Sequence, residues 1–435
     1  MSEEKSIITT LNNNLKVQLV LIPGARTSLF SVGFHAGSMY EEGFGAGSND
    51  GISHFLEHMF FKGIPGKKTS KQINDEFTRL GAELNAGTSY DHTIYYAKVP
   101  TRNFRKAAEI WKELLINKTL DPIEFKAEKQ VVLQEIQWYE DMPEMNANNM
   151  VRKKHFTGTA LEHNITGTLD SVSAITLEMM TEYIKRFYSL DNAVVTLVGG
   201  DFDLEEEKNF LTSLFNESIP QPKLHPIFPP SVTMPIKKSQ INYFKSATSK
   251  PLCYVALNWN TPGINSTDFW PLLVLNTYIG NSRTSLLYRE VISKGIASVC
   301  RYGFEALYDI SSATILFVTP PERTEEVFQK VINLLIHIYS VKITPNIVNA
   351  LKEEIWGSYL SEIEDPTNYG IDLLTKYLKF RKPLPIKDFQ QKIQVSHDEV
   401  QDAKDSFLEK LNLTVYATGA VPQDWEPQFP KESPW

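Results

Sequence analysis

The feature that most constrains the fold of this chain is an internal repeat. In the first half, a strand-like stretch at residues 89–100 precedes an amphipathic helical pattern at residues 103–118. Residues 311–322 and 327–339 repeat this order in the second half. A duplicated unit that mixes strands with helices accounts for the order. The repeat therefore predicts an α+β fold of two homologous domains, each a mainly antiparallel sheet covered by helices.

Two further pairs of segments extend the repeat. Residues 120–143 and 343–366 each read as a helix that begins beside a proline and ends near an aspartate that a second proline soon follows. Each half then ends in a strand-like run, at residues 192–202 and at residues 411–421. Because these matches run through both halves, we expect the duplication to account for most of the chain.

The boundary between the domains is predicted from prolines. They crowd residues 217–235, and proline cannot donate a backbone hydrogen bond to a helix or to a sheet ladder. The chain has 435 residues, which is more than one hydrophobic core usually organises. We therefore predict a first domain at residues 1–216, a linker at residues 217–235 and a second domain at residues 236–435. We expect the two domains to face one another as a clamshell.

Composition and charge exclude several classes of protein. A net charge of −8 argues against a nucleic-acid binder, which would usually carry a basic face. No apolar run approaches the ~18 residues that a membrane span needs. The first residues lack the basic and apolar regions of a secretory leader, which predicts a cytoplasmic location. The two cysteines, Cys253 and Cys300, lie far apart in apolar runs and indicate neither a disulfide scaffold nor a thiolate metal site.

The strongest candidate for chemistry is the stretch HFLEH. It places His54 and His58 four residues apart, so both imidazoles of a helix could reach one ion. Glu57 lies on the same side but offset, which suits a group that contacts a metal-bound water. A zinc hydrolase needs these separate roles for histidines and glutamate, because the cation activates water and polarises a carbonyl while a carboxylate carries the proton. The alternative is an ordinary amphipathic helix with a partly buried histidine pair.

A catalytic zinc site needs a third protein ligand from another element. The helical pattern at residues 120–143 offers Glu128 and Glu135, which are seven residues apart and so lie on nearly the same side of a helix. One of them could bind the ion while the other accepts a hydrogen bond from a ligand histidine. Spacing alone does not choose between them, and glutamates are also common on a solvated helix face.

These motifs together resemble the pitrilysin or insulinase family of zinc peptidases, which carries the inverted H-x-x-E-H motif. Besides HFLEH, the resemblance includes FKG shortly after it, LNAGTSYDHTIYY, and the acidic helix that ends in VVLQEIQWYEDMP. The resemblance covers nearly the whole chain. It implies that His54, His58 and Glu135 bind Zn²⁺. It also implies that Glu57 is the general base and that Glu128 supports a ligand histidine at the catalytic site.

The resemblance also implies how a substrate binds. In the family the edge strand after LNA pairs with the substrate backbone, so Asn85 and Ala86 are candidates for substrate contact. Pairing of this kind holds an extended peptide through main-chain bonds, with little regard for its sequence. The alternative is that Asn85 only caps or turns the chain. We expect a zinc endopeptidase that cleaves unfolded or short peptides inside an enclosed chamber.

The second half departs from the family pattern. Family members usually carry an arginine and a tyrosine there that bind the substrate carbonyl, but the matching positions hold Val291 or Ile292, and Ser298. The family includes heterodimers in which a zinc-less subunit supplies this pair. We therefore predict that this chain is the metal-bearing subunit of a heterodimer with a zinc-less homologous subunit. The alternatives are a homodimer that uses Arg289 or Arg301, a processing peptidase that removes leader peptides, and a mainly structural assembly subunit.

Overall fold

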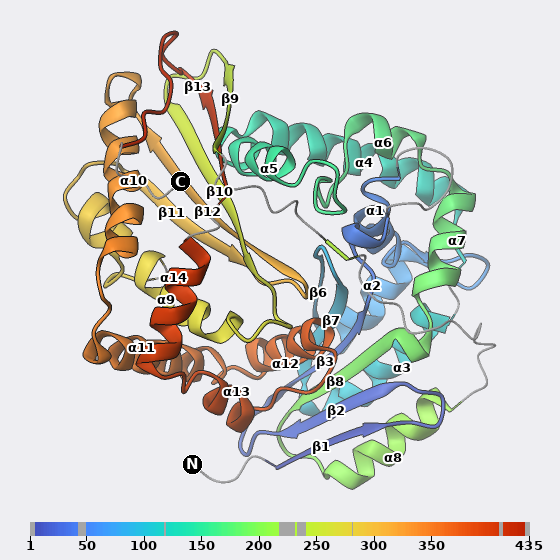
Figure 1. Ribbon diagram of the computed structural model, residues 1–435. Coiled ribbons are helices and arrows are strands. Elements are labelled where there is room, and N and C mark those ends of the chain that lie inside the picture. The colour runs from blue at the N-terminus through green and yellow to red at the C-terminus, as the bar shows by residue number, and fades with distance from the viewer. Residues whose placement is uncertain are drawn as a thin grey trace. The chain divides into compact units, whose positions relative to one another are not determined.

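The computed structural model describes residues 5–41, 49–116, 119–216, 231–232, 241–280, 282–408 and 412–430. The chain divides into two compact units, which Figure 1 shows as ribbons. The first unit comprises Met1–Gln137, His163–Pro230 and Leu360–Pro385, and the second comprises Trp138–Glu162, Ser231–Tyr359 and Ile386–Trp435. Each unit therefore contains a segment from the opposite half of the sequence.

A six-stranded sheet is the centre of the first unit. In spatial order its strands are β1 (Lys5–Thr10), β2 (Lys16–Leu21), β8 (Ala193–Gly199), β3 (Thr27–Phe34), β7 (Thr93–Pro100) and β6 (Glu83–Thr88). Neighbours are antiparallel, except that β2 and β8 run parallel. β8 is buried along its full length, as its largely apolar sequence predicts for a central strand. β6 lies at one edge and, within the described ranges, pairs with β7 alone.

Helices pack on both faces of this sheet. The helices of this unit are α1 (Ile52–Met59), α2 (Ser70–Arg79), α3 (Phe104–Ile116), α4 (Pro122–Asp141), α6 (Leu169–Ala174), α7 (Leu177–Phe187), α8 (Leu204–Phe215) and α12 (Pro366–Phe380). Short elements complete the unit: η1 (Ser38–Tyr40), η2 (Thr101–Asn103), η3 (Leu190–Asn192) and the pair β4 (Gly63–Ile64) and β5 (Lys68–Thr69). Because side chains alternate along a strand, Val195 joins the large core, whereas Val194 packs with Leu374 and Leu378 of α12 on the other face.

The second unit is built on a five-stranded sheet. In spatial order its strands are β11 (Val299–Glu305), β12 (Ile310–Thr319), β10 (Cys253–Pro262), β13 (Leu413–Gly419) and β9 (Ile241–Ala247). Its helices are α5 (Pro143–His155), α9 (Phe269–Gly280), α10 (Thr324–Ser340), α11 (Pro345–Glu362), α13 (Ile386–Lys392) and α14 (His397–Leu408), with the short elements η4 (Tyr288–Ile292) and η5 (Pro321–Arg323). Ala147 and Val151 of α5 pack on Ala256, Leu316 and Tyr416 of the sheet.

The two sheets confirm the internal duplication. The order β6-β7-β3-β8-β2 in the first unit corresponds to β11-β12-β10-β13-β9 in the second. In both units the last pair of this series is parallel and the other pairs are antiparallel. The predicted α+β class with two homologous domains is therefore confirmed. The clamshell arrangement of the two domains stays a prediction.

Each unit contains one helix from the other half of the sequence. α12 follows α11 in the second half but packs on β3 and β8 of the first unit, and Figure 1 shows it beside these strands. Reciprocally, α5 follows α4 in the first half but packs on β10 and β13 of the second unit. Gly33 of β3 lets α12 approach closely, because a Cβ there would lie 2.5 Å from Leu378 Cδ1. The exchange is part of the duplicated plan, since α4–α5 and α11–α12 are the corresponding pairs.

Two remaining predictions concern the linker and the membrane. Within the linker predicted at residues 217–235, all positions except Ser231 and Val232 lie outside the described residues. The boundaries at residues 216 and 236 stay predictions. In the part of the chain that the structure describes, no helix is both long and apolar enough to cross a membrane.

Candidate metal centre

The predicted histidines lie on α1, a short helix with one buried face. Ile52, Phe55, Leu56 and Met59 follow helical spacing and are buried in the large core. The helix begins at Gly51, whose φ of 91° is a conformation that favours glycine. The buried face fixes the rotation of the helix about its axis.

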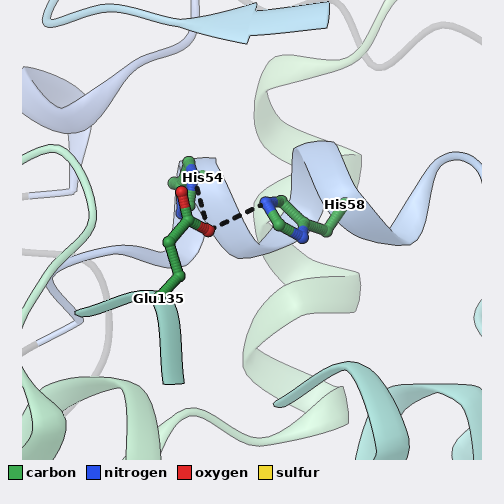
Figure 2. A group of neighbouring side chains, drawn as sticks. All are labelled: His54, His58 and Glu135. Atoms are coloured by element: carbon green, nitrogen blue, oxygen red, sulfur yellow. Dashed lines mark ion pairs between the residues drawn. The ribbon is translucent and has the colours of Figure 1, made fainter. Parts of the chain in front are cut away.

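The structure brings together the three residues that the resemblance assigns to zinc. His54, His58 and Glu135 each offer one ligand atom, and these atoms all lie within 4.8 Å of one another. Oε2 of Glu135 lies 3.8 Å from Nε2 of His54 and 3.5 Å from Nε2 of His58. Figure 2 shows the carboxylate of Glu135 reaching from α4 toward both imidazoles on α1.

These separations fit a tetrahedral zinc ion. Bonds of about 2.0–2.2 Å from zinc to nitrogen and oxygen place neighbouring tetrahedral ligands about 3.4 Å apart. The separations of 3.5 and 3.8 Å are close to this value and do not describe short hydrogen bonds. The side chains of His54, His58 and Glu135 are 11%, 21% and 26% exposed, so solvent can reach the site. Two imidazoles and one carboxylate are the donor set of a catalytic zinc site with one open position.

Glu128 fixes the orientation of His58. Its Oε1 lies 2.8 Å from Nδ1 of His58, and its Oε2 lies 2.5 Å from Nζ of Lys62. When Nδ1 of His58 donates to this carboxylate, Nε2 keeps its lone pair and faces Glu135. Burial raises the pKa of Glu128, but the hydrogen bonds from His58 and Lys62 outweigh burial and hold this pKa below its usual value. Glu128 is therefore an anionic acceptor beside His58.

The surroundings keep His54 neutral. Burial, together with the nearby His58, lowers the pKa of His54 to about 3. A neutral imidazole has the lone pair that a metal ligand needs. For His58, burial lowers the pKa, but the hydrogen bond to Glu128 and the charges of Glu57 and Glu135 outweigh burial and raise it overall. The two imidazoles of the pair thus have different proton affinities.

Glu57 is held by the edge strand. Thr88 at the end of β6 donates a hydrogen bond of 2.6 Å from Oγ1 to Oε2 of Glu57. Burial raises the pKa of Glu57, and the bond from Thr88 and the charge of His58 oppose this rise. A carboxylate with a raised pKa binds a proton more readily than an exposed one, which suits a general base that must also give the proton away.

Asn85 and Ala86 lie on the edge strand β6, where they pair with Tyr96 and Tyr95 of β7. The backbone N–H of Ala86 donates to the side-chain oxygen of Asn85 at 2.9 Å. This bond is the local capping that was the alternative to substrate contact. It occupies one backbone donor that an added strand could otherwise use.

Three residues of this region were not found from the sequence: Glu41, Lys62 and Thr88. Glu41 accepts hydrogen bonds from the first turn of α1, and the other two contact Glu128 and Glu57. Lys62 falls four residues after His58, a spacing that places both on one helical side and could have indicated a shared partner. Glu41 and Thr88 carry no comparable local signal.

The second unit holds the positions where the family pair is missing. Val291 is fully buried in the core of this unit, and Ser298 is exposed. Tyr302 is partly buried, and its hydroxyl donates to Oδ1 of Asn276 at 2.5 Å. Arg301 is 69% exposed and donates from Nη1 to Glu144 at 2.8 Å. Of these side chains, only Ser298 and Arg301 face solvent.

The fold and the site define a class of protein: duplicated α+β units in which one helix carries an inverted zinc motif and a second helix supplies a glutamate. Residues 16–169 match the family described as "Insulinase (Peptidase family M16)". Residues 174–355 match the description "Peptidase M16 inactive domain". The chain belongs to the M16 or insulinase family of peptidases.

Named relatives agree with this assignment. The chain is 26% identical over 363 residues to "Uncharacterized zinc protease YmxG" of Bacillus subtilis, covering 82% of this chain and 84% of that protein. It is 24% identical over 436 residues to "Mitochondrial-processing peptidase subunit beta" of Dictyostelium discoideum, covering 95% and 88%. The crystal structure of a protease from Helicobacter pylori has the same fold, with a TM-score of 0.84, 23% identity and coverage of 96% and 100%.

Proposed function

We propose that this chain is a zinc-dependent endopeptidase that cleaves unfolded or short peptides. The observation that carries the proposal is the convergence of His54, His58 and Glu135 beside a glutamate, Glu57, that an edge strand holds. A structural zinc site would use a fourth protein ligand, whereas three ligands leave a position for water. Relatives named as zinc proteases support the same activity.

Each side chain has a distinct task in this proposal. His54, His58 and Glu135 would hold the ion, and Glu128 would keep His58 in the orientation that directs Nε2 inward. When bound, zinc lowers the pKa of water and polarises the scissile carbonyl. Glu57 takes the proton of the attacking water and delivers it to the leaving amine. Thr88 holds the Glu57 carboxylate in position through this transfer.

The substrate would add as a strand along β6. The outer edge of β6 is unpaired in the described part of the sheet, and its end carries Thr88, which contacts Glu57. An extended peptide on this edge therefore lies beside the general base. In this proposal Asn85 releases the N–H of Ala86, and the substrate takes that donor. Main-chain pairing accepts many sequences, which suits unfolded peptides enclosed in a chamber.

The proposed function also requires a partner subunit. We propose a heterodimer with a zinc-less homologous subunit, because Val291 or Ile292 stands at the position of the family arginine and Ser298 at that of the tyrosine. Similarity to proteins named as a beta subunit of a processing peptidase supports a function within a pair. The rival is a homodimeric processing peptidase that removes leader peptides. The cytoplasmic location stays a prediction.

The decisive experiment measures bound zinc and the cleavage of an unstructured peptide by the purified chain, alone and with a zinc-less homologous subunit. We expect about one zinc per chain, and activity that rises with the partner and is lost in Glu57→Gln while zinc remains. Absence of zinc from the wild type would refute the catalytic proposal. Full activity of a monomer would refute the partner alone. Zinc without cleavage under either condition would favour a mainly structural assembly subunit.

A further inference from the structure

The first turn of α1 has no cap from its own residues. Gly51, at the N-cap, has no side chain, and the helix contains only eight residues. The N–H groups of a first turn have no partner within their helix and need outside acceptors, without which a short helix frays. His54 lies in this turn. Its position therefore depends on whatever satisfies these groups.

Glu41 supplies the missing cap from outside the helix. Its Oε2 accepts the N–H of Gly51 at 2.9 Å, and its Oε1 accepts the N–H of Ser53 at 2.8 Å. Only 2% of the residue is exposed, so water does not substitute for either bond. Burial raises the pKa of Glu41, and the hydrogen bonds from Ser53 and Gly51 oppose this rise because both favour the ionised carboxylate. Each of its two oxygens thus serves one backbone donor of the turn.

Residues 38–41, which include Glu41, also contact the residues that follow the edge strand β6. In η1, directly before Glu41, the N–H of Ser38 donates to the carbonyl of Ser89 at 3.2 Å. The N–H of Met39 donates to the carbonyl of Tyr90 at 2.9 Å. Ser89 and Tyr90 directly follow β6 in the chain. Residues 38–41 therefore contact both the turn after β6 and the first turn of α1.

We infer that Glu41 is a positioning residue, which sets the first turn of α1, and with it His54, relative to the edge strand β6. The inference rests on the proposed zinc site but adds a residue to which that proposal gives no role. Glutamine at this position has only one acceptor oxygen, and its amide nitrogen would meet a second N–H donor. Glu41→Gln therefore loses one of the two bonds while it keeps the size of the side chain.

The test compares Glu41→Gln with Glu399→Gln. Glu399 is an exposed glutamate that also accepts a backbone bond at a helix start, from Ser396 at 2.7 Å, but lies in the second unit. Zinc affinity would be measured by competition with a chelator, and amide exchange of α1 would be followed in the zinc-free protein. We expect roughly tenfold weaker zinc binding in Glu41→Gln, as for other residues that support metal ligands. The amides of the first turn should exchange faster in this variant, and Glu399→Gln should match the wild type.

Kinetics separate positioning from general destabilisation. At saturating zinc, Glu41→Gln should recover most of its kcat with an unchanged KM, because the defect lies in holding the ion. If Glu41→Gln does not fold, Glu41→Asp, which keeps both oxygens on a shorter side chain, takes its place with a smaller expected loss. Wild-type zinc affinity and wild-type amide exchange in a folded variant would overturn the inference. Absence of zinc from the wild type would instead overturn the proposed function, and amide exchange would still decide whether Glu41 holds the turn.

Discussion

Thr88, at the end of the edge strand, donates a hydrogen bond of 2.6 Å to Glu57 on the neighbouring helix α1. The residue proposed as general base is therefore held by the strand proposed to carry the substrate. A peptide that pairs with β6 is placed against the same element that orients Glu57. This relationship gives the first prediction.

Thr88→Val should lower kcat with little change in KM. The substitution keeps the shape of the side chain but removes a bond to a charged group, and such bonds contribute about 1.5–3 kcal/mol. If about half of this free energy is lost in the transition state, kcat falls roughly four- to tenfold. Steady-state cleavage of an unstructured peptide measures the effect. Thr88→Ser restores the hydroxyl and should restore kcat, and an equal loss in the serine variant would contradict this assignment.

Glu135→Gln should weaken zinc binding more than Glu128→Gln does. Glu135 would contribute a ligand oxygen directly, whereas Glu128 acts through Nδ1 of His58, and removal of such supporting groups costs 10–100-fold in affinity. Zinc content after dialysis and chelator competition would rank the two variants. The reverse order would mean that the roles of the two glutamates are exchanged.

Lys62→Met should weaken zinc binding roughly tenfold without unfolding the protein. Nζ of Lys62 lies 2.5 Å from Oε2 of Glu128, and without the ammonium group this carboxylate loses one of the two contacts that hold it against His58. Lys185→Met is a matched control, because Lys185 also pairs with a glutamate, Glu182, at 2.5 Å but lies on the surface. Equal affinity in the wild type and both variants would show that the pair with Glu128 is incidental.

The stability of the protein should fall as the pH drops below about 6.5. Burial, followed by the charge of Arg381, lowers the pKa of His35 to about 3, so the folded state rejects a proton that the unfolded chain accepts near the ordinary histidine pKa of 6.5. The contribution of neutral His35 to the stability is complete above pH 6.5 and is lost progressively as the pH falls to about 3. At pH 5 this one residue costs about 2 kcal/mol.

Urea denaturation of the wild type and His35→Gln at pH 7 and pH 5 tests this pH dependence. The variant should be less stable at pH 7 but should lose about 2 kcal/mol less between the two conditions. His337→Gln, which changes an exposed histidine near the end of α10, is the matched control. A wild-type slope in His35→Gln would assign the acid sensitivity to other groups.

Periodicity predicted much of the fold and part of the candidate site. The matching halves predicted the duplicated sheets, and the seven-residue spacing placed Glu128 and Glu135 on one side of α4, from which both reach α1. These features are local, because helical and strand periods are fixed by backbone geometry. Spacing did not decide which glutamate faces the histidines; that assignment came from the family resemblance.

Other features depend on long-range contacts, which periodicity does not specify. The pattern of α12 indicates an apolar face with Leu374 and Leu378, but it does not indicate that this face covers the sheet of the opposite half. Helical spacing likewise does not indicate that Trp138, near the end of α4, is 56% exposed. The contact between Glu41 and α1 joins residues that lie ten and twelve positions apart in the sequence. Such contacts follow from the folded arrangement alone.

The exchanged helices have a consequence for synthesis on the ribosome. The sheet of the first unit is complete once Gly199 has emerged, but α12, which covers Val194 and Ile94, ends only at Phe380. At about 5–20 residues per second, this apolar surface stays uncovered for roughly 10–35 seconds. During this interval the nascent chain exposes an apolar surface that chaperones and neighbouring chains can bind. Truncated chains that end before α12 should therefore aggregate instead of forming a folded first unit.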